Sequence, residues 1–197
     1  MQPENVNLAG LVLAGGAGRR MQGLDKGLQL HRGRPLVEWI VASMQACVSE
    51  LVVSANRHRH EYSQYAEQVL FDSNNAHYSG PMAGICRAIE HYATESRIQG
   101  LLISPCDTPN ITQALWQSVI SKAEENPNLP VVCHDGERPQ SLHCLLPRAM
   151  WPALLTSYGD GNRTMHHWLR ENGAVELDCS DRAAEFVNLN YVEELSG

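Results

Sequence analysis

The chain has 197 residues, of which 43% are apolar and 19% charged, and its formal net charge is -7. This composition is typical of a folded protein with a hydrophobic core and excludes a disordered chain. The acidic balance argues against non-specific nucleic-acid binding, which needs many lysines and arginines near the phosphates. We therefore expect a single domain over residues 1–197 that has no nucleic-acid partner.

The sequence also predicts a cytoplasmic protein without a membrane anchor. No apolar run approaches the ~20 residues that a membrane-spanning helix needs. The first seven residues are polar and do not resemble a signal peptide. Six cysteines are scattered without a Cys-x-x-Cys pair, which indicates reduced thiols rather than a disulfide scaffold or a zinc site.

The first 71 residues alternate short apolar runs with segments of helical spacing. Residues 7–14 are predicted to form a buried strand, and residues 15–33, rich in glycine and basic residues, a loop. Pro35 suits a first helical turn, and it precedes five apolar residues at helical spacing, namely Leu36, Trp39, Ile40, Met44 and Val48. A short helix over 60–68 is predicted between strands over 51–53 and 69–71.

The same alternation continues to the end of the chain. Pro81 opens a predicted helix whose apolar face carries Ile85, Ala88, Ile89 and Tyr92. The other predicted elements are strands over 101–104, 131–133 and 142–146 and helices over 112–125 and 192–195. This order predicts an α/β, Rossmann-like fold with a mostly parallel sheet and helices on both faces. In such sheets ligands bind beyond the carboxyl ends of the strands.

A glycine-rich segment with clustered cations follows the first predicted strand. It reads Leu-Ala-Gly-Gly-Ala-Gly-Arg-Arg-Met over residues 13–21 and continues to Asp25 and Lys26. The glycines let backbone N–H groups approach an anion, and Arg19, Arg20 and Lys26 locally reverse the sign of an acidic chain. The segment therefore predicts a site for a triphosphate or pyrophosphate. It is neither a Walker A loop nor a dinucleotide fingerprint. An ordinary glycine-rich turn with solvated cations is the alternative.

An aspartate between two prolines follows the strand predicted over 101–104. Asp107 lies in the sequence Ser-Pro-Cys-Asp-Thr-Pro, where the prolines restrict the backbone. Mg²⁺ takes one or two carboxylates together with phosphate oxygens and waters, so Asp107 is a candidate metal ligand. The alternative is that Asp107 only caps the next helix or a turn. Cys106 is interpreted as a packing residue, since the sequence offers no base to activate it.

A weaker signal comes from Asp72 and the segment Gly-Pro-Met-Ala-Gly over residues 80–84. Asp72 follows a predicted strand, and small residues at the start of a helix admit a base or ribose. The helix N-terminus favours an anion. Taken alone, these residues are more simply explained by an ordinary helix start after a loop.

These blocks together resemble the molybdenum cofactor guanylyltransferases, the MobA family. The segment from Leu13 to Lys26 resembles that family's signature, and later blocks follow in the same order, at residues 54–57, 72, 80–84, 105–109, 134–137 and 186–190. Enzymes of this family transfer GMP from GTP to molybdopterin and release pyrophosphate. The resemblance implies GTP and molybdopterin or molybdenum-molybdopterin as substrates and Mg²⁺ as cofactor. It also implies molybdoenzyme clients and cofactor-delivery proteins as partners.

The resemblance further implies roles for individual residues. The backbone of residues 13–15 would contact guanine and ribose, Asp72 the nucleotide, and Asp107 the Mg²⁺ ion. Several relatives have Asn where this chain has Ser54, whose side chain reaches less far. The implied binding residues are Leu13, Ala14, Gly15, Gly16, Lys26, Ser54, Asp72, Asp107, Arg163, Asn188 and Asn190. Of these, Arg163, Asn188 and Asn190 would bind molybdopterin. The implied catalytic residues are Lys26, Asp107 and Arg19.

Two alternatives stay open at the level of the sequence. One is a related nucleotidyltransferase of the same fold that uses CTP or a sugar-phosphate acceptor. The other is a non-catalytic protein that binds a nucleotide or carries the cofactor to a client enzyme. The first would release pyrophosphate with a different nucleotide or acceptor, and the second would bind GTP without releasing pyrophosphate.

Overall fold

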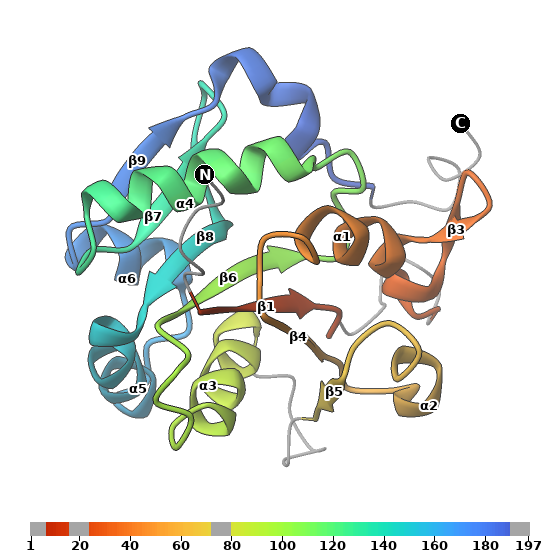
Figure 1. Ribbon diagram of the computed structural model, residues 1–197, viewed down its shortest axis with the longest axis horizontal. Coiled ribbons are helices and arrows are strands. Elements are labelled where there is room, and N and C mark those ends of the chain that lie inside the picture. The colour runs from red at the N-terminus through yellow and green to blue at the C-terminus, as the bar shows by residue number, and fades with distance from the viewer. Residues whose placement is uncertain (1–6, 16–23, 72–79, 190–197) are drawn as a thin grey trace.

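A seven-stranded sheet in the order β5-β4-β1-β6-β8-β7-β9 forms the centre of the computed structural model (Figure 1). The structure describes residues 7–15, 24–71 and 80–189. Its sheet strands are β1 (Leu8–Leu13), β4 (Glu50–Ser54), β5 (Gln68–Leu70), β6 (Gly100–Pro105), β7 (Val131–His134), β8 (Pro139–Pro147) and β9 (Val175–Asp178).

Every strand pair in this sheet is parallel except the two that involve β8. A hairpin joins β7 to β8, so β8 runs against its neighbours β6 and β7. The predicted mostly parallel sheet is therefore confirmed. Because the other six strands run the same way, their carboxyl ends meet at one edge of the sheet.

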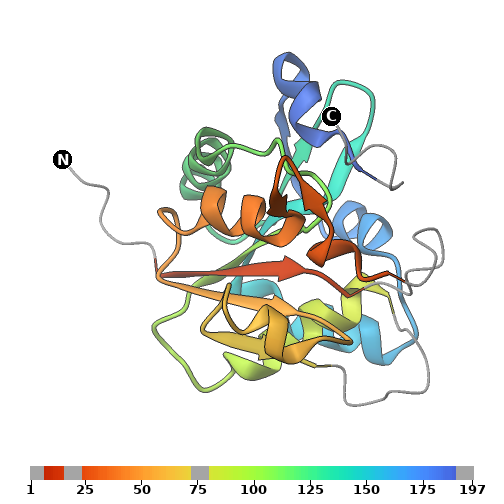
Figure 2. The same cartoon turned by 90° about the vertical axis from the view of Figure 1, so that its right-hand side faces the viewer.

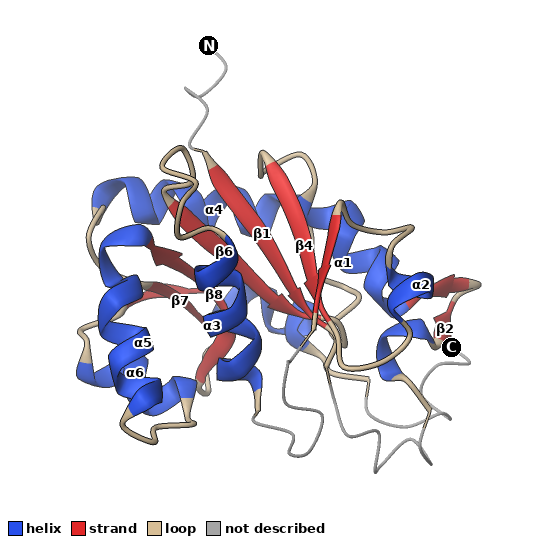
Figure 3. Cartoon of the chain, turned by 90° about the horizontal axis from the view of Figure 1, so that it is seen from below, coloured by secondary structure: helices blue, strands red, loops and turns tan. Residues whose placement is uncertain are grey.

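Helices cover both faces of the sheet, as predicted. They are α1 (Leu36–Met44), α2 (Arg59–Tyr62), α3 (Pro81–His91), α4 (Gln113–Glu125), α5 (Trp151–Gly159) and α6 (Met165–Glu171). Figure 1 shows α1 and α4 on one side of the strands and α3 and α5 on the other, and Figure 3 shows α3, α5 and α6 together on the second face. In the part of the chain that the structure describes, no helix is both long and apolar enough to cross a membrane.

The side chains of β1 alternate between two hydrophobic clusters. Leu8 and Val12 pack with residues of α1 and α4, whereas Ala9, Leu11 and Leu13 pack with residues of α3, α5 and α6. Figure 2 shows β1, in red, between these two layers. A strand buried on both faces needs apolar residues at every position, which explains the continuous apolar run that predicts β1.

The sequence predictions are wrong in detail in the segments around α1 and α2. The predicted loop over 15–33 contains the 3₁₀ turn η2 (Lys26–Leu28) and, with the two residues after it, the small hairpin of β2 (Leu30–His31) and β3 (Arg34–Pro35). Helix α1 ends at Met44, and Val48 is apolar because it packs on the core from the following loop. The predicted helix over 60–68 is the single turn α2. The predicted helix over 192–195 lies outside the described residues.

Two further 3₁₀ segments, η3 (Arg148–Met150) and η4 (Ser180–Phe186), lie in the second half of the chain. The second of them leads to residues 187–189, which return to the carboxyl edge of the sheet. There the Leu189 N–H donates to the Asp107 carbonyl at 2.9 Å. The end of the described chain is thus attached to the loop that follows β6.

Candidate functional site

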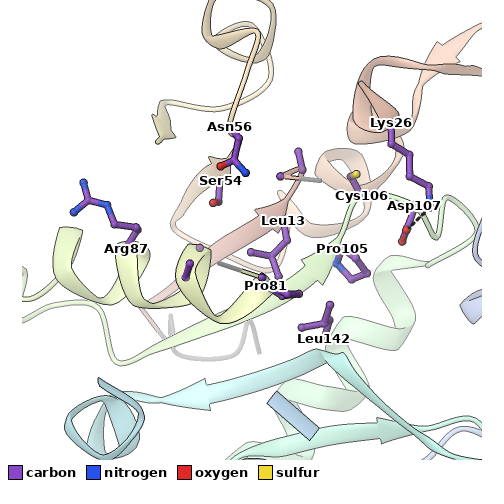
Figure 4. Close-up of a pocket in the computed structure, with 15 residues that line it drawn as sticks. Leu13, Lys26, Ser54, Asn56, Pro81, Arg87, Pro105, Cys106, Asp107 and Leu142 are labelled. Atoms are coloured by element: carbon purple, nitrogen blue, oxygen red, sulfur yellow. Dashed lines mark hydrogen bonds and ion pairs between the residues drawn. The ribbon is translucent and has the colours of Figure 1, made fainter. Parts of the chain in front are cut away.

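A pocket lies at the carboxyl ends of β1, β4 and β6, the edge at which ligands of parallel α/β sheets bind (Figure 4). Its walls come from the ends of these strands, from η2, from the first turns of α3 and from β8. The residues that line it are Leu13, Ala14, Gly15, Lys26, Ser54, Asn56, Gly80, Pro81, Ala83, Gly84, Arg87, Pro105, Cys106, Asp107 and Leu142.

The end of β1 is held on both sides by its neighbouring strands. The Ala14 N–H donates to the Ser54 carbonyl at 2.8 Å, and the Leu13 carbonyl accepts from the Cys106 N–H at 3.1 Å. Gly15 then leaves the sheet along the wall of the pocket. The backbone of Leu13 and Ala14 is therefore held by hydrogen bonds to both neighbouring strands.

Three residues distant in the sequence meet above the end of β6. The Lys26 ammonium donates to Asp107 Oδ2 at 2.5 Å and to Asn188 Oδ1 at 2.8 Å, and Figure 4 shows Lys26 directed at Asp107. The side chains of Lys26 and Asp107 are only 19% and 16% exposed. Asp107 Oδ1 is buried and has no hydrogen-bond partner among the described residues. This unpaired carboxylate oxygen is a donor of the kind that hard cations take.

Asp107 does not cap the helix that follows it. The N-cap of α4 is Thr112, whose hydroxyl accepts from the Leu115 N–H at 3.3 Å. The capping alternative is therefore wrong for α4. The neighbouring Cys106 is buried, and burial, with Asp107 adding to it, raises the pKa of its thiol far above the usual range. A protonated buried thiol agrees with a packing role.

A buried histidine supports the loop that carries Asp107. His143 of β8 lies with its Nε2 atom 2.9 Å from the Thr108 hydroxyl, stacks on Trp116 and meets Phe186 edge to face. Burial lowers the pKa of His143 to about 3, so the ring is neutral at physiological pH. His143 was not predicted as part of the site, because a single histidine in an apolar strand has no spacing to mark it.

Acidification should destabilise the protein through His143. The folded pKa is about 3, and the unfolded ring titrates near 6.5, so between these values only the unfolded state binds the proton. Stability is therefore lost as the pH falls through this window, by about 2 kcal/mol between pH 7 and pH 5 from this group alone. The check is denaturant unfolding at both pH values for the wild type and His143→Gln. Equal pH dependence of the two proteins would contradict the expectation.

Helix α3 begins against the ends of β1 and β4. A Cβ atom on Gly84 would lie 2.6 Å from Ser54 Oγ and 2.9 Å from Leu13 Cδ2, so only glycine allows this close approach. Gly84 thus allows α3 to pack closely on β1 and β4, while the predicted contact of this segment with a base or ribose stays a prediction. One turn later Arg87 lines the pocket, donates to the Phe71 carbonyl and pairs with a glutamate of its own helix. Arg87 was not predicted as a site residue, although its spacing of four from Ala83 places both on one helix face.

The remaining predicted residues are not brought into the pocket or are not described. Arg163 does not line it, since its guanidinium donates to the Tyr158 and Asn162 carbonyls and stacks on the Tyr158 ring. Asn188 does not line the pocket itself, but its side-chain oxygen accepts a hydrogen bond from the pocket residue Lys26. Four predicted residues lie outside the described part of the chain, namely Gly16, Arg19, Asp72 and Asn190.

Comparison with known proteins gives consistent matches over nearly the whole chain. The family model of the MobA-like NTP transferase domain matches residues 10–176. Proteins named molybdenum cofactor guanylyltransferase from Mannheimia succiniciproducens and Ectopseudomonas mendocina are each 34% identical to this chain. The matches cover 97% and 94% of this chain and 98% and 89% of the relatives. The crystal structure of molybdopterin-guanine dinucleotide biosynthesis protein A from Archaeoglobus fulgidus shares the fold, with a TM-score of 0.75, 19% identity and coverage of 95% and 94%.

Proposed function

Because this chain belongs to the MobA-like NTP transferase family, and within it to the molybdenum cofactor guanylyltransferases, we propose that it transfers GMP from GTP to molybdopterin. The product is the guanine dinucleotide form of the cofactor, and pyrophosphate is released. The acceptor is molybdopterin or its molybdenum-bound form. We place the reaction in the cytoplasm, and we expect molybdoenzyme clients and cofactor-delivery proteins to take up the product.

The convergence of Lys26, Asp107 and Asn188 beside the end of β1 is the observation that carries this proposal. A cation and a carboxylate with an unused oxygen lie where a glycine-rich segment leaves the sheet. Transfer between two phosphate groups needs little else from a protein, since catalysis consists of positioning the anions and neutralising their charge. A covalent enzyme intermediate is not required, in line with the inert Cys106.

In the proposed reaction an oxygen of the terminal phosphate of molybdopterin attacks the α-phosphorus of GTP in line. The bond from that phosphorus to the bridging oxygen breaks, and pyrophosphate leaves with the electron pair. Lys26 exchanges Asp107 for the phosphates and neutralises their charge there. Arg19, which lies outside the described residues, is proposed to add a second cation.

The buried Oδ1 atom of Asp107 fits a divalent metal, which nucleotidyltransferases of this family typically use. We propose that Asp107 holds Mg²⁺. The ion would act as a Lewis acid on the phosphate oxygens. The protein itself keeps the Asp107 carboxylate in place. The Leu189 N–H donates to the Asp107 carbonyl, and the next residue, Thr108, is hydrogen-bonded to the buried His143.

The base and ribose are proposed to bind along residues 13–15, with Ser54 and Asp72 as further contacts and Gly16 beside them. Ser54 is 7% exposed and packed under α3, so its hydroxyl reaches the ligand only at close range. Asn56, two residues after Ser54 at the end of β4, also lines the pocket, and its side chain is longer than that of Ser54. Arg163 and Asn190 stay proposed contacts of molybdopterin, and Asn188 is proposed to face both substrates.

A pyrophosphate-release assay with each of the four nucleoside triphosphates and purified molybdopterin tests this function. GTP with molybdopterin should give release, and the omission of either should abolish it. Release with CTP instead would indicate a cytidylyltransferase of the same fold, and release with a sugar phosphate a different acceptor class. Binding of GTP without release would indicate a carrier.

The preference for GTP should depend on Gly15. A methyl group at this position would come within 3.3–3.4 Å of the Asn56 side chain and push it by a few tenths of an ångström. We expect Gly15→Ala to weaken the use of GTP and to lower the ratio of kcat/KM for GTP over CTP by about tenfold. Gly159→Ala is the matched control, since a Cβ there would meet nothing within 4 Å. Equal use of GTP and CTP by the wild type would defeat the guanylyl assignment.

A further inference from the structure

We propose that Asp25, Gly27 and Tyr62 form a buried latch that positions Lys26 toward the phosphates. Asp25 and Gly27 flank Lys26 in the chain, and both contact the hydroxyl of Tyr62 in α2. The inference rests on the role proposed above for Lys26. It makes Asp25 and Tyr62 positioning residues and not catalytic ones, because neither lines the pocket that would hold the substrates.

The hydrogen bond between Tyr62 and Asp25 is the first part of this latch. The Tyr62 hydroxyl donates to Asp25 Oδ1 at 2.5 Å, and the two residues are 0% and 8% exposed. A buried carboxylate needs a strong partner, and hydrogen bonds to charged groups are among the strongest in proteins. Tyr62 itself is packed in the cluster under α1 and α4. The loop that carries Lys26 is therefore tied to the core immediately before that residue.

The close contact at Gly27 is the second part. A Cβ atom on Gly27 would lie 2.4 Å from the Tyr62 hydroxyl oxygen, so this backbone position packs directly on the same group. The Gln29 amide closes the turn by donating to the Asp25 carbonyl at 2.8 Å. Lys26 thus lies between two positions fixed on Tyr62, and its side chain leaves the turn on the side of Asp107.

The latch depends on Tyr62 remaining a hydrogen-bond donor. Burial, with Asp25 contributing, raises the pKa of Tyr62 far above its usual value. The hydroxyl therefore keeps its proton and remains a donor.

A flexible lysine loses many rotamers when it binds a phosphate, and fixing its backbone in advance lowers that cost. Misplacement of a charge-stabilising group by about 1 Å can cost 10²-fold in rate.

A double-mutant cycle between Tyr62→Phe and Lys26→Ala tests the latch. Tyr62→Phe removes only the hydroxyl and should lower kcat/KM for GTP by roughly tenfold, since Lys26 is then poorly placed. In the Lys26→Ala background the same change should have almost no further effect on kcat/KM. A purely structural role would give the same fold-loss in both backgrounds, and that result, or no loss in either, would overturn the proposal.

The control is Tyr92→Phe, at the end of α3. This tyrosine is also buried, and its hydroxyl has no hydrogen-bond partner in the described part of the chain, so its removal should leave kcat/KM unchanged. Asp25→Ala should behave like Tyr62→Phe, whereas Asp25→Asn keeps an acceptor oxygen and should lose less. Unfolding midpoints check that every variant is folded.

In addition to turnover, calorimetry measures the affinity of every variant for GTP and for CTP in the presence of Mg²⁺. Tyr62→Phe should weaken triphosphate binding in the wild-type background only. A wild type that binds a triphosphate but transfers no GMP would end the proposed function, while the affinity cycle would still decide the latch. A wild type that transfers GMP, with Tyr62 and Lys26 acting independently, would end the latch alone.

Discussion

Asp107→Asn is expected to lower kcat for GMP transfer by a factor on the order of 10²–10³, with a much smaller effect on GTP affinity. The substitution keeps the shape of the side chain and an oxygen for the Lys26 ammonium. It removes the negative charge, and with it the ability of the buried Oδ1 atom to hold a divalent cation. The effect falls mainly on kcat because charge develops in the transition state.

Steady-state kinetics at saturating Mg²⁺, with GTP affinity measured separately, checks this expectation. Asp160→Asn, at the exposed end of α5, makes the same chemical change at a residue that does not line the pocket and serves as the control. Near-normal turnover of Asp107→Asn would remove Asp107 from the metal site. A loss of affinity equal to the loss of kcat/KM would show that Asp107 acts in binding and not in the chemical step.

Lys26→Ala is the second large effect that we expect, a loss of about 10²-fold in kcat/KM for GTP. The Michaelis constant should rise and kcat should fall, because a cation that faces the triphosphate acts in both the ground state and the transition state. The remaining lysine of the chain, Lys122, forms a solvent-exposed pair with Glu125 on α4. Lys122→Ala therefore removes the same charge without touching the pocket. Unchanged kinetics in Lys26→Ala would make Lys26 an ordinary surface residue.

Much of the fold could be predicted because its strands have unmistakable local patterns. The run at residues 8–13 is apolar at every position, since β1 is covered on both faces. Pro81 starts α3, and Asp107 and Lys26 belong to short motifs that mark them as candidate ligands of a metal ion and of phosphates. The organisation as one nucleotidyltransferase domain over residues 1–197 stays a prediction.

The features that the sequence did not predict depend on contacts between distant residues. The strands β2 and β3 have two residues each, too few to show any alternation. Asp25 and Tyr62 are separated by 37 positions and neither is unusual in its own neighbourhood. The partners of His143, from the loop after β6, α4 and η4, become neighbours only when the sheet assembles. Local spacing carries no information about such pairs.

The ion pair of Lys26 and Asp107 has a consequence for the whole catalytic cycle. The two opposite charges neutralise each other, which offsets the cost of their partial burial. In the proposed reaction the triphosphate competes with Asp107 for the Lys26 ammonium, and the energy of separating the ion pair is subtracted from the observed affinity. In the proposed reaction the same competition applies to pyrophosphate, so Asp107 weakens the hold of Lys26 on substrate and product alike. The strength of this ion pair is thus expected to set triphosphate affinity against the rate of pyrophosphate release.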